Sequence, residues 1–245
     1  MRNLKVIMAY RGTNYHGYQI QANALTVQEV VQKAVSEILN EKVTINGCSR
    51  TDTGVHANGY CFSVKTESRI PHINFIRGVN GKLPDDISIL SCEDADEDFH
   101  ARFSCKAKEY IYKIHMSESK NPFTSDLELH YRRPLDVELM DRAAKKFIGT
   151  HDFKSFCSVD TKTEDTVRTI YNFDVVRKDE NSVIMLVKGN GFLYNMVRIM
   201  AGTLIYVSEG RISEDDIERI IIAKNRELAG KTAQPHGLYL NKVFY

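Results

Sequence analysis

The sequence predicts an α+β fold made of two related units, and three observations lead to this expectation. The chain has 245 residues, enough for one large domain or for two smaller ones with their own cores. Its apolar content of 42% and charged content of 27% are those of an ordinary globular protein. Each half shows the same succession of patterns: a strand, a helix, further strands and another helix. We therefore expect an N-terminal unit over residues 1–105 and a C-terminal unit over residues 106–245.

The first unit opens with a strand over residues 4–10, which is followed by a well-marked helix. Thr26 and Glu29 have the spacing of a capping box, and apolar residues follow at helical intervals as far as Leu39. Beyond that helix, the pattern predicts a short strand near 43–48, a longer strand near 59–66, a helix over 73–83 that ends at Pro84, and a strand over 87–92.

The second unit follows an exposed connection at residues 99–103. Its first strand covers residues 109–116, where Tyr110, Tyr112, Ile114 and Met116 alternate onto one face. The remaining patterns predict a helix over 137–148 with the stripe Leu139, Ala143, Ala144 and Phe147, strands over 169–178 and 182–189, a buried helix over 192–207, and a helix from 213 with the face Ile217, Ile220 and Ile221.

Composition indicates an intracellular protein without a membrane segment. The first residues are too interrupted for a signal peptide, and no apolar run is long enough to cross a bilayer. The five cysteines are odd in number and form no C-x-x-C pair, so we expect reduced thiols, with neither disulfides nor a structural zinc. These features predict a cytoplasmic protein.

Charge alone does not indicate a nucleic-acid enzyme. The chain has 33 Lys and Arg against 32 Asp and Glu, a formal net charge of +1. Proteins that bind nucleic acids usually show a basic bias, because phosphate contacts supply most of their affinity. Composition by itself favours a small-molecule enzyme, and an RNA-binding function requires the basic residues to gather on one face.

One polar turn carries more functional groups than a reversal of the chain needs. Residues 49–57 read Ser-Arg-Thr-Asp-Thr-Gly-Val-His-Ala and lie between two apolar segments. A carboxylate on a short loop between strands, here Asp52, is suited to act as a nucleophile or base. The plain alternative is a turn in which Asp52 caps and Gly54 takes a positive φ. Cys48 lies close by in an apolar strand, where a packing role is favoured over a nucleophilic one.

Arg198 stands out because it lies in the most apolar predicted helix of the chain. A buried guanidinium is costly unless it is paired, so Arg198 requires a carboxylate or a phosphate as a partner. The alternative is a structural arginine that is bound to some other acid.

Residues 49–57 resemble the catalytic signature of the tRNA pseudouridine synthase A family, G-R-T-D-A-G-V-H-A, at seven of nine positions. Ser49 replaces the family's Gly, and Thr53 replaces its Ala. Tyr15-His16-Gly17-Tyr18-Gln19 is similar to the family's Y-x-G-W-Q, with Tyr18 in place of Trp. Further similar segments cover residues 99–104, 108–112, 149–157, 189–200 and 230–240, so the resemblance extends from about residue 3 to residue 243.

The resemblance implies a pseudouridine synthase fold, with two RRM-like halves forming a central antiparallel sheet with flanking helices. It assigns Asp52 as the catalytic nucleophile, Tyr110 as the residue that stacks on the target base, and Arg198 as the partner of Asp52. Leu238 would line the floor of the pocket, and Arg50 would contact RNA. The reaction needs no cofactor and no metal, because it isomerises a nucleoside without redox change.

The resemblance of this chain also implies a substrate, namely uridines at positions 38, 39 and 40 in the anticodon stem-loop of tRNA, and a homodimer in which one tRNA spans both subunits. Two other classes of protein stay open. One is a catalytically silent RNA-binding module, and the other is a metal-dependent hydrolase that uses Asp52 and His56. Further candidate phosphate contacts are Arg11, Arg77, Arg102, Arg168, Lys145 and Lys146.

Overall fold

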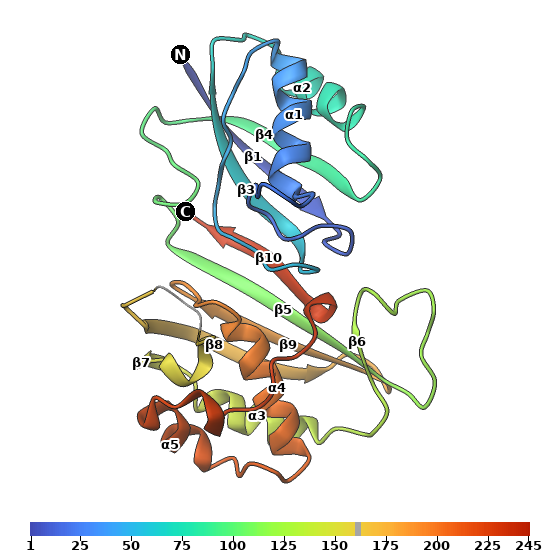
Figure 1. Ribbon diagram of the computed structural model, residues 1–245, viewed down its shortest axis with the longest axis vertical. Coiled ribbons are helices and arrows are strands. Elements are labelled where there is room, and N and C mark those ends of the chain that lie inside the picture. The colour runs from blue at the N-terminus through green and yellow to red at the C-terminus, as the bar shows by residue number, and fades with distance from the viewer. Residues whose placement is uncertain (160–162) are drawn as a thin grey trace. The chain divides into compact units, whose positions relative to one another are not determined.

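The computed structural model describes residues 1–159 and 163–245, and Figure 1 shows its helices and strands. The chain divides into two compact units, one of residues 1–106 with 239–245 and one of residues 107–238. The sequence predicts that all of residues 106–245 belong to the second unit. In the structure, residues 239–245 instead belong to the first unit. No helix in the described ranges is long and apolar enough to cross a membrane.

The first unit is a mixed sheet with two helices. Strand β1 lies between β3 and β4 and is antiparallel to both, whereas β10 runs parallel to β3. The short β2 pairs with β3. The elements are β1 (Arg2–Tyr10), α1 (Val27–Leu39), β2 (Asn46–Gly47), β3 (His56–Thr66), α2 (His72–Asn80), β4 (Ile87–Ala95) and β10 (Leu238–Phe244).

The first helix begins where its sequence signal predicts. The side chain of Thr26 accepts a hydrogen bond from the backbone N–H of Glu29, which confirms the cap. Helix α1 buries Val27, Val31 and Val35, the apolar stripe expected from their spacing. The helix ends at Asn40, whose left-handed backbone stops the helical ladder.

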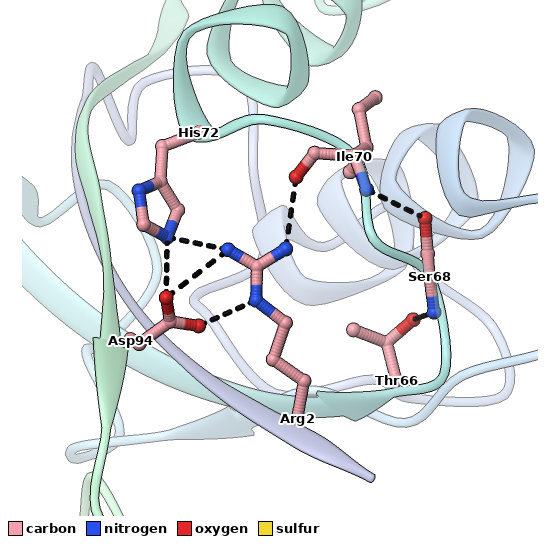
Figure 2. Close-up of polar contacts among 6 residues, drawn as sticks. All are labelled: Arg2, Thr66, Ser68, Ile70, His72 and Asp94. Atoms are coloured by element: carbon pink, nitrogen blue, oxygen red, sulfur yellow. Dashed lines mark hydrogen bonds and ion pairs between the residues drawn. The ribbon is translucent and has the colours of Figure 1, made fainter.

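Arg2 joins three elements at the edge of this unit (Figure 2). Its guanidinium donates to Asp94 on β4 and to the carbonyl oxygen of Ile70 at 2.8 Å. It also lies 2.7 Å from Nε2 of His72, the first residue of α2. The hydrogen bond from Arg2 holds the pKa of Asp94 below its usual value. This cluster therefore fixes β4 and the start of α2 against β1.

The second unit is also a mixed sheet with helices. Strands β5, β9, β8 and β7 follow one another in antiparallel pairs, and β6 adds to β5 in parallel. The elements are β5 (Ala107–Met116), β6 (Leu129–Tyr131), α3 (Val137–Lys145), β7 (Gly149–Asp152), β8 (Val167–Arg177), β9 (Ser182–Gly189), α4 (Met196–Ser208) and α5 (Asp216–Ala223), with short 3-10 turns at Lys154–Phe156, Arg226–Leu228 and Pro235–Gly237. The α+β class is confirmed, and the two parallel pairs make the sheet mixed rather than antiparallel.

Two elements differ from their sequence predictions for local reasons. The strand expected near 43–48 shrinks to β2, because side chains of α1 bond to the backbone of Val43 and Ile45. The helix expected over 192–207 begins only at Met196, because Asn195 takes a left-handed backbone with φ 61°. In α3 the buried stripe includes Met140 rather than Leu139.

Candidate active site

The signature loop turns at Gly54 and presents Asp52 near the start of β3. Gly54 has φ +78°, and the backbone N–H of Val55 donates to the carbonyl oxygen of Asp52 at 3.1 Å. The Asp52 residue is half-buried, whereas Arg50 is exposed. The loop thus has the form of a tight turn, as its glycine predicts, and it still offers a carboxylate at the surface of the first unit.

The segment that follows β1 holds this loop in place through hydrogen bonds of Tyr15 and Tyr18. The backbone N–H of Tyr18 donates to the carbonyl oxygen of Thr51 at 3.2 Å, and that of Gly54 donates to the carbonyl oxygen of Tyr15 at 3.3 Å. The Thr51 hydroxyl lies 2.8 Å from that of Tyr10. Gly17 has φ +80°, and a Cβ atom there would lie 2.5 Å from the Thr51 carbonyl oxygen. Only glycine permits this approach, so the backbone beside Asp52 is closely fixed.

Two stacked aromatic rings support the entry to the loop. Tyr18 lies on Tyr60 with ring centroids 4.3 Å apart and an interplanar angle of 27°. Tyr60 in turn donates from its hydroxyl to the carbonyl oxygen of Ser49. Tyr18 stands where the related family has Trp, and it keeps an aromatic contact at that position.

His56 and Cys48 both lie in the interior of the first unit. His56 is fully buried, and its Nδ1 accepts a hydrogen bond from the backbone N–H of Gly12 at 2.9 Å. A ring nitrogen that accepts from a backbone N–H has no lone pair left for a metal. Among residues 1–159 and 163–245 no group of three His, Cys, Asp or Glu side chains is arranged to hold a metal ion. Cys48 is fully buried, in agreement with a packing role.

In the second unit, Tyr110 and Tyr112 lie on the same buried face of β5, as the alternation predicts. Tyr110 packs edge-to-face against Phe192, with ring centroids 5.1 Å apart. The hydroxyl of Tyr112 donates to the carbonyl oxygen of Gln234 at 2.8 Å, and burial raises the pKa of this phenol. Tyr112 is therefore committed to the core through its bond to Gln234.

Arg198 is the third residue of α4 and is half-buried rather than buried. Its Nε donates to the carbonyl oxygen of Ala233 at 2.8 Å, and its Nη1 donates to Oδ1 of Asn195 at 2.7 Å. Both of these acceptors are neutral. The first turn of a helix carries partial positive charge, so a cation at this place is unfavourable without an anion nearby. Arg198 is suited to hold a carboxylate or a phosphate.

The segment after α5 reaches Arg198 because two glycines allow it to lie against α4. A Cβ atom on Gly202 would come 1.7 Å from the Lys231 carbonyl oxygen, and one on Gly230 would come 2.5 Å from the backbone nitrogen of Thr203. This close contact places Ala233 beside Arg198. The same segment leads to Leu238, which is buried. Sequence reasoning did not find Asn195 and Ala233, because their roles depend on backbone geometry.

The basic residues proposed as phosphate contacts divide into two groups. Lys145 and Lys146 are already engaged, since Lys145 Nζ lies 2.6 Å from Asp174 and Lys146 Nζ lies 3.2 Å from Glu218. Both lysines therefore form ion pairs within the second unit, and their role as phosphate contacts stays a prediction. Arg50, in contrast, faces solvent beside Asp52.

Comparison with known proteins shows which family the chain belongs to. The model of the tRNA pseudouridine synthase family matches residues 6–104 and 143–245. The chain is 48% identical over 245 residues to tRNA pseudouridine synthase A of Ruminiclostridium cellulolyticum and 44% identical over 245 residues to that of Thermoanaerobacter pseudethanolicus, with the whole of each chain covered. A solved structure, the crystal structure of a Cbf5-Nop10-Gar1 complex, aligns with a TM-score of 0.41 at 11% identity, over 97% of this chain and 48% of that chain. The chain therefore belongs to the tRNA pseudouridine synthase A family, whose members are isomerases that act on uridine in tRNA.

Proposed function

We propose that this enzyme modifies uridines at positions 38, 39 and 40 of the tRNA anticodon stem-loop, and that Asp52 is its nucleophile. The observation that carries the proposal is the half-buried carboxylate of Asp52 on a loop whose backbone is held by Tyr18 and Gly54. Preorganisation of this kind is what a nucleophile needs, because small displacements of a reacting group lower the rate steeply.

The reaction sets a short list of requirements. The glycosidic bond between N1 and C1′ breaks, the uracil turns within the pocket, and a new bond joins C5 to C1′. The proton on C5 is lost and N1 gains one, so the product is an isomer of the substrate. A carboxylate serves as the nucleophile, a second group accepts the C5 proton, and the pocket holds the base out of its stack.

Arg198 is proposed to pair with Asp52 and keep it ionised. An opposite charge within a few ångströms favours the charged form of a carboxyl group and lowers its pKa. The planar guanidinium also orients a carboxylate through paired hydrogen bonds. The support comes from the second unit: Arg198 is at the positive end of α4, and its contacts with Asn195 and Ala233 leave its charge uncompensated by those two residues.

Tyr110 is proposed to stack on the flipped uracil, a contact worth ~1–3 kcal/mol per base. Its buried position against Phe192 keeps the ring in one orientation, which lowers the entropic cost of stacking. Leu238 is proposed to line the pocket floor, and the exposed Arg50 to contact an RNA phosphate.

The enzyme is further proposed to act in the cytoplasm as a homodimer that binds one tRNA across both subunits. A homodimer would offset the near-neutral net charge of +1, because two modest basic surfaces together attract RNA better than one. Sedimentation of the protein with and without tRNA tests it, and a monomer that binds and modifies tRNA at full rate would exclude it.

The central experiment compares Asp52→Asn with Asp85→Asn. Both remove one negative charge with little change of shape, and Asp85 is an exposed residue outside the signature loop. We expect Asp52→Asn to abolish pseudouridine formation on unmodified tRNA transcripts while the control keeps wild-type activity. Mapping modified uridines in tRNA from cells that lack the protein tests the positions. Full activity of Asp52→Asn would refute the assignment of the nucleophile.

A further inference from the structure

The turn before α4 contains a residue whose side chain bridges Arg198 to a distant segment. Asn195 has φ 61° and ψ 5°, directly ahead of the first helical residue. Its Oδ1 accepts from Nη1 of Arg198 at 2.7 Å, and its Nδ2 donates to Oγ of Ser158 at 2.7 Å. Because a guanidinium only donates, the amide must turn its oxygen toward Arg198, and its nitrogen then faces Ser158.

We propose that Asn195 is a positioning residue that fixes the Arg198 guanidinium without neutralising its charge. This inference rests on the proposed pairing of Arg198 with Asp52. The Asn195 contact and the bond from Nε to the Ala233 carbonyl hold the guanidinium at two of its nitrogens, which defines the plane of the group. The backbone N–H of Ala233 also donates to the carbonyl oxygen of Arg198 at 3.0 Å, so this anchor is rigid.

The chemical reason for an amide at this position is its neutrality. Asparagine and aspartate both tolerate the left-handed backbone that residue 195 adopts. An aspartate would accept from Arg198 equally well, and it would accept from the Ser158 hydroxyl in place of the amide contact. It would, however, place a full negative charge 2.7 Å from the guanidinium. That charge would compete with Asp52 for Arg198.

Ser158 supports the turn from the other side. Its backbone N–H donates to the carbonyl oxygen of Tyr194 at 3.2 Å, in addition to the contact of its hydroxyl with Asn195. The Asn195 amide is therefore held at both ends.

The decisive variant is Asn195→Asp, which conserves shape and backbone preference and changes only the charge. If Asn195 positions a charge for Asp52, kcat falls by about 10²-fold while the KM for tRNA stays near the wild-type value. The acid limb of the pH profile of kcat moves to higher pH, because the new carboxylate weakens the hold of Arg198 on Asp52 and so raises the pKa of Asp52.

Other titratable groups also lie near these residues. Burial lowers the pKa of His236, which stays neutral from neutral pH upward, and burial raises the pKa of Tyr112. His56 is buried, and its Nδ1 accepts a hydrogen bond from the backbone N–H of Gly12. Movement of an acid limb that lies in the range of a carboxyl group, rather than in that of an imidazole, therefore reports on Asp52.

Asn40→Asp is the matched control. Asn40 also has a left-handed backbone, with φ 54°, but it is exposed and ends α1 in the first unit. We expect wild-type kcat and pH profile for this variant. Asn195→Gly keeps the backbone conformation and removes the amide, so it should lower kcat with a smaller shift of the acid limb than Asn195→Asp.

The outcomes separate this inference from the proposed function. Activity of Asp52→Asn would overturn both. If Asp52→Asn is inactive but folded Asn195→Asp has wild-type kcat and acid limb, the positioning role is wrong and the nucleophile assignment stands. Should Asn195→Asp unfold at the assay temperature, Asn195→Gly decides, and wild-type kcat for that variant would also overturn the inference.

Discussion

Replacing Gly17 with alanine should disable the signature loop without touching any catalytic residue. A Cβ atom at this position would lie 2.5 Å from the carbonyl oxygen of Thr51, and ordinary contacts begin at 3.4 Å. The two backbones must therefore separate by about 0.9 Å, and Thr51 directly precedes Asp52. Since a misplacement of about 1 Å can cost 10²-fold in rate, we expect kcat to fall by about that factor.

The same substitution also lowers stability. Gly17 has φ +80°, and a residue with a side chain in the left-handed region costs about 1–2 kcal/mol relative to its preferred conformation. The hydrogen bond from Tyr18 to Thr51 would lengthen or break, which adds about 1 kcal/mol. We expect a free energy of unfolding about 2–3 kcal/mol below that of the wild type.

Gly210→Ala separates backbone strain from loop displacement. Gly210 has φ +71°, but a Cβ atom there would meet nothing within 4 Å. This control should lose about 1–2 kcal/mol in urea unfolding and keep its activity. Single-turnover pseudouridine formation, measured with excess enzyme at a temperature where all variants are folded, gives the rates. Equal single-turnover rates for wild type and Gly17→Ala would refute the argument that this close approach positions Asp52.

Three further predictions follow from the same geometry. Tyr110→Phe should bind tRNA with wild-type affinity but lose turnover by about 10²-fold or more if its hydroxyl accepts the C5 proton, and unchanged turnover would leave stacking as its only role. Replacing Ser49 with Gly and Thr53 with Ala restores the family signature and should change turnover or preference among uridines; no change in either would make both departures neutral. Asp174→Asn should lower the melting temperature at pH 7, because the hydrogen bond from Lys145 holds the pKa of Asp174 below 3.8. That stabilisation is present above pH 3.8 and is lost as the pH falls through the lowered pKa of Asp174. The difference in melting temperature between wild type and Asp174→Asn should therefore disappear in acid. A difference that does not change with pH would contradict the role of the Lys145–Asp174 pair.

Local signals predicted the elements that depend on local contacts. The cap at Thr26, the alternation along β5 and the buried face of α5 all depend on residues within a few positions of one another. The strand predicted near 43–48 is shorter than expected, because side chains of α1 such as Gln32 hydrogen-bond to the backbone of this segment. The pairing of β10 with β3 could not be predicted from local patterns either, because Tyr239 and His56 are far apart in the sequence.

In the candidate site, too, the features that depend on nearby residues were predictable and those that depend on distant residues were not. Asp52 is visible in the sequence because its neighbours form a dense motif, and Arg198 is visible because a charge interrupts an apolar helix. The environment of Arg198 was not predictable, since Arg198 is half-buried although Val197 and Ile199 on either side of it are buried. The role of Asn195 depends on one backbone angle and on Ser158, and neither has a signal in the sequence.

Asp52 in the first unit and Arg198 in the second are each positioned by contacts with neutral groups. Asp52 is located through backbone hydrogen bonds and a glycine contact, and Arg198 is located through the amide of Asn195 and the carbonyl of Ala233. Contacts with neutral groups fix the position of a charged residue without cancelling its charge. Charges that are held in place in this way need little reorganisation during a reaction, which is the main source of electrostatic catalysis. If Asp52 and Arg198 act as proposed, exchanging the neutral residue next to either of them for a charged one of equal shape should cost more activity than stability.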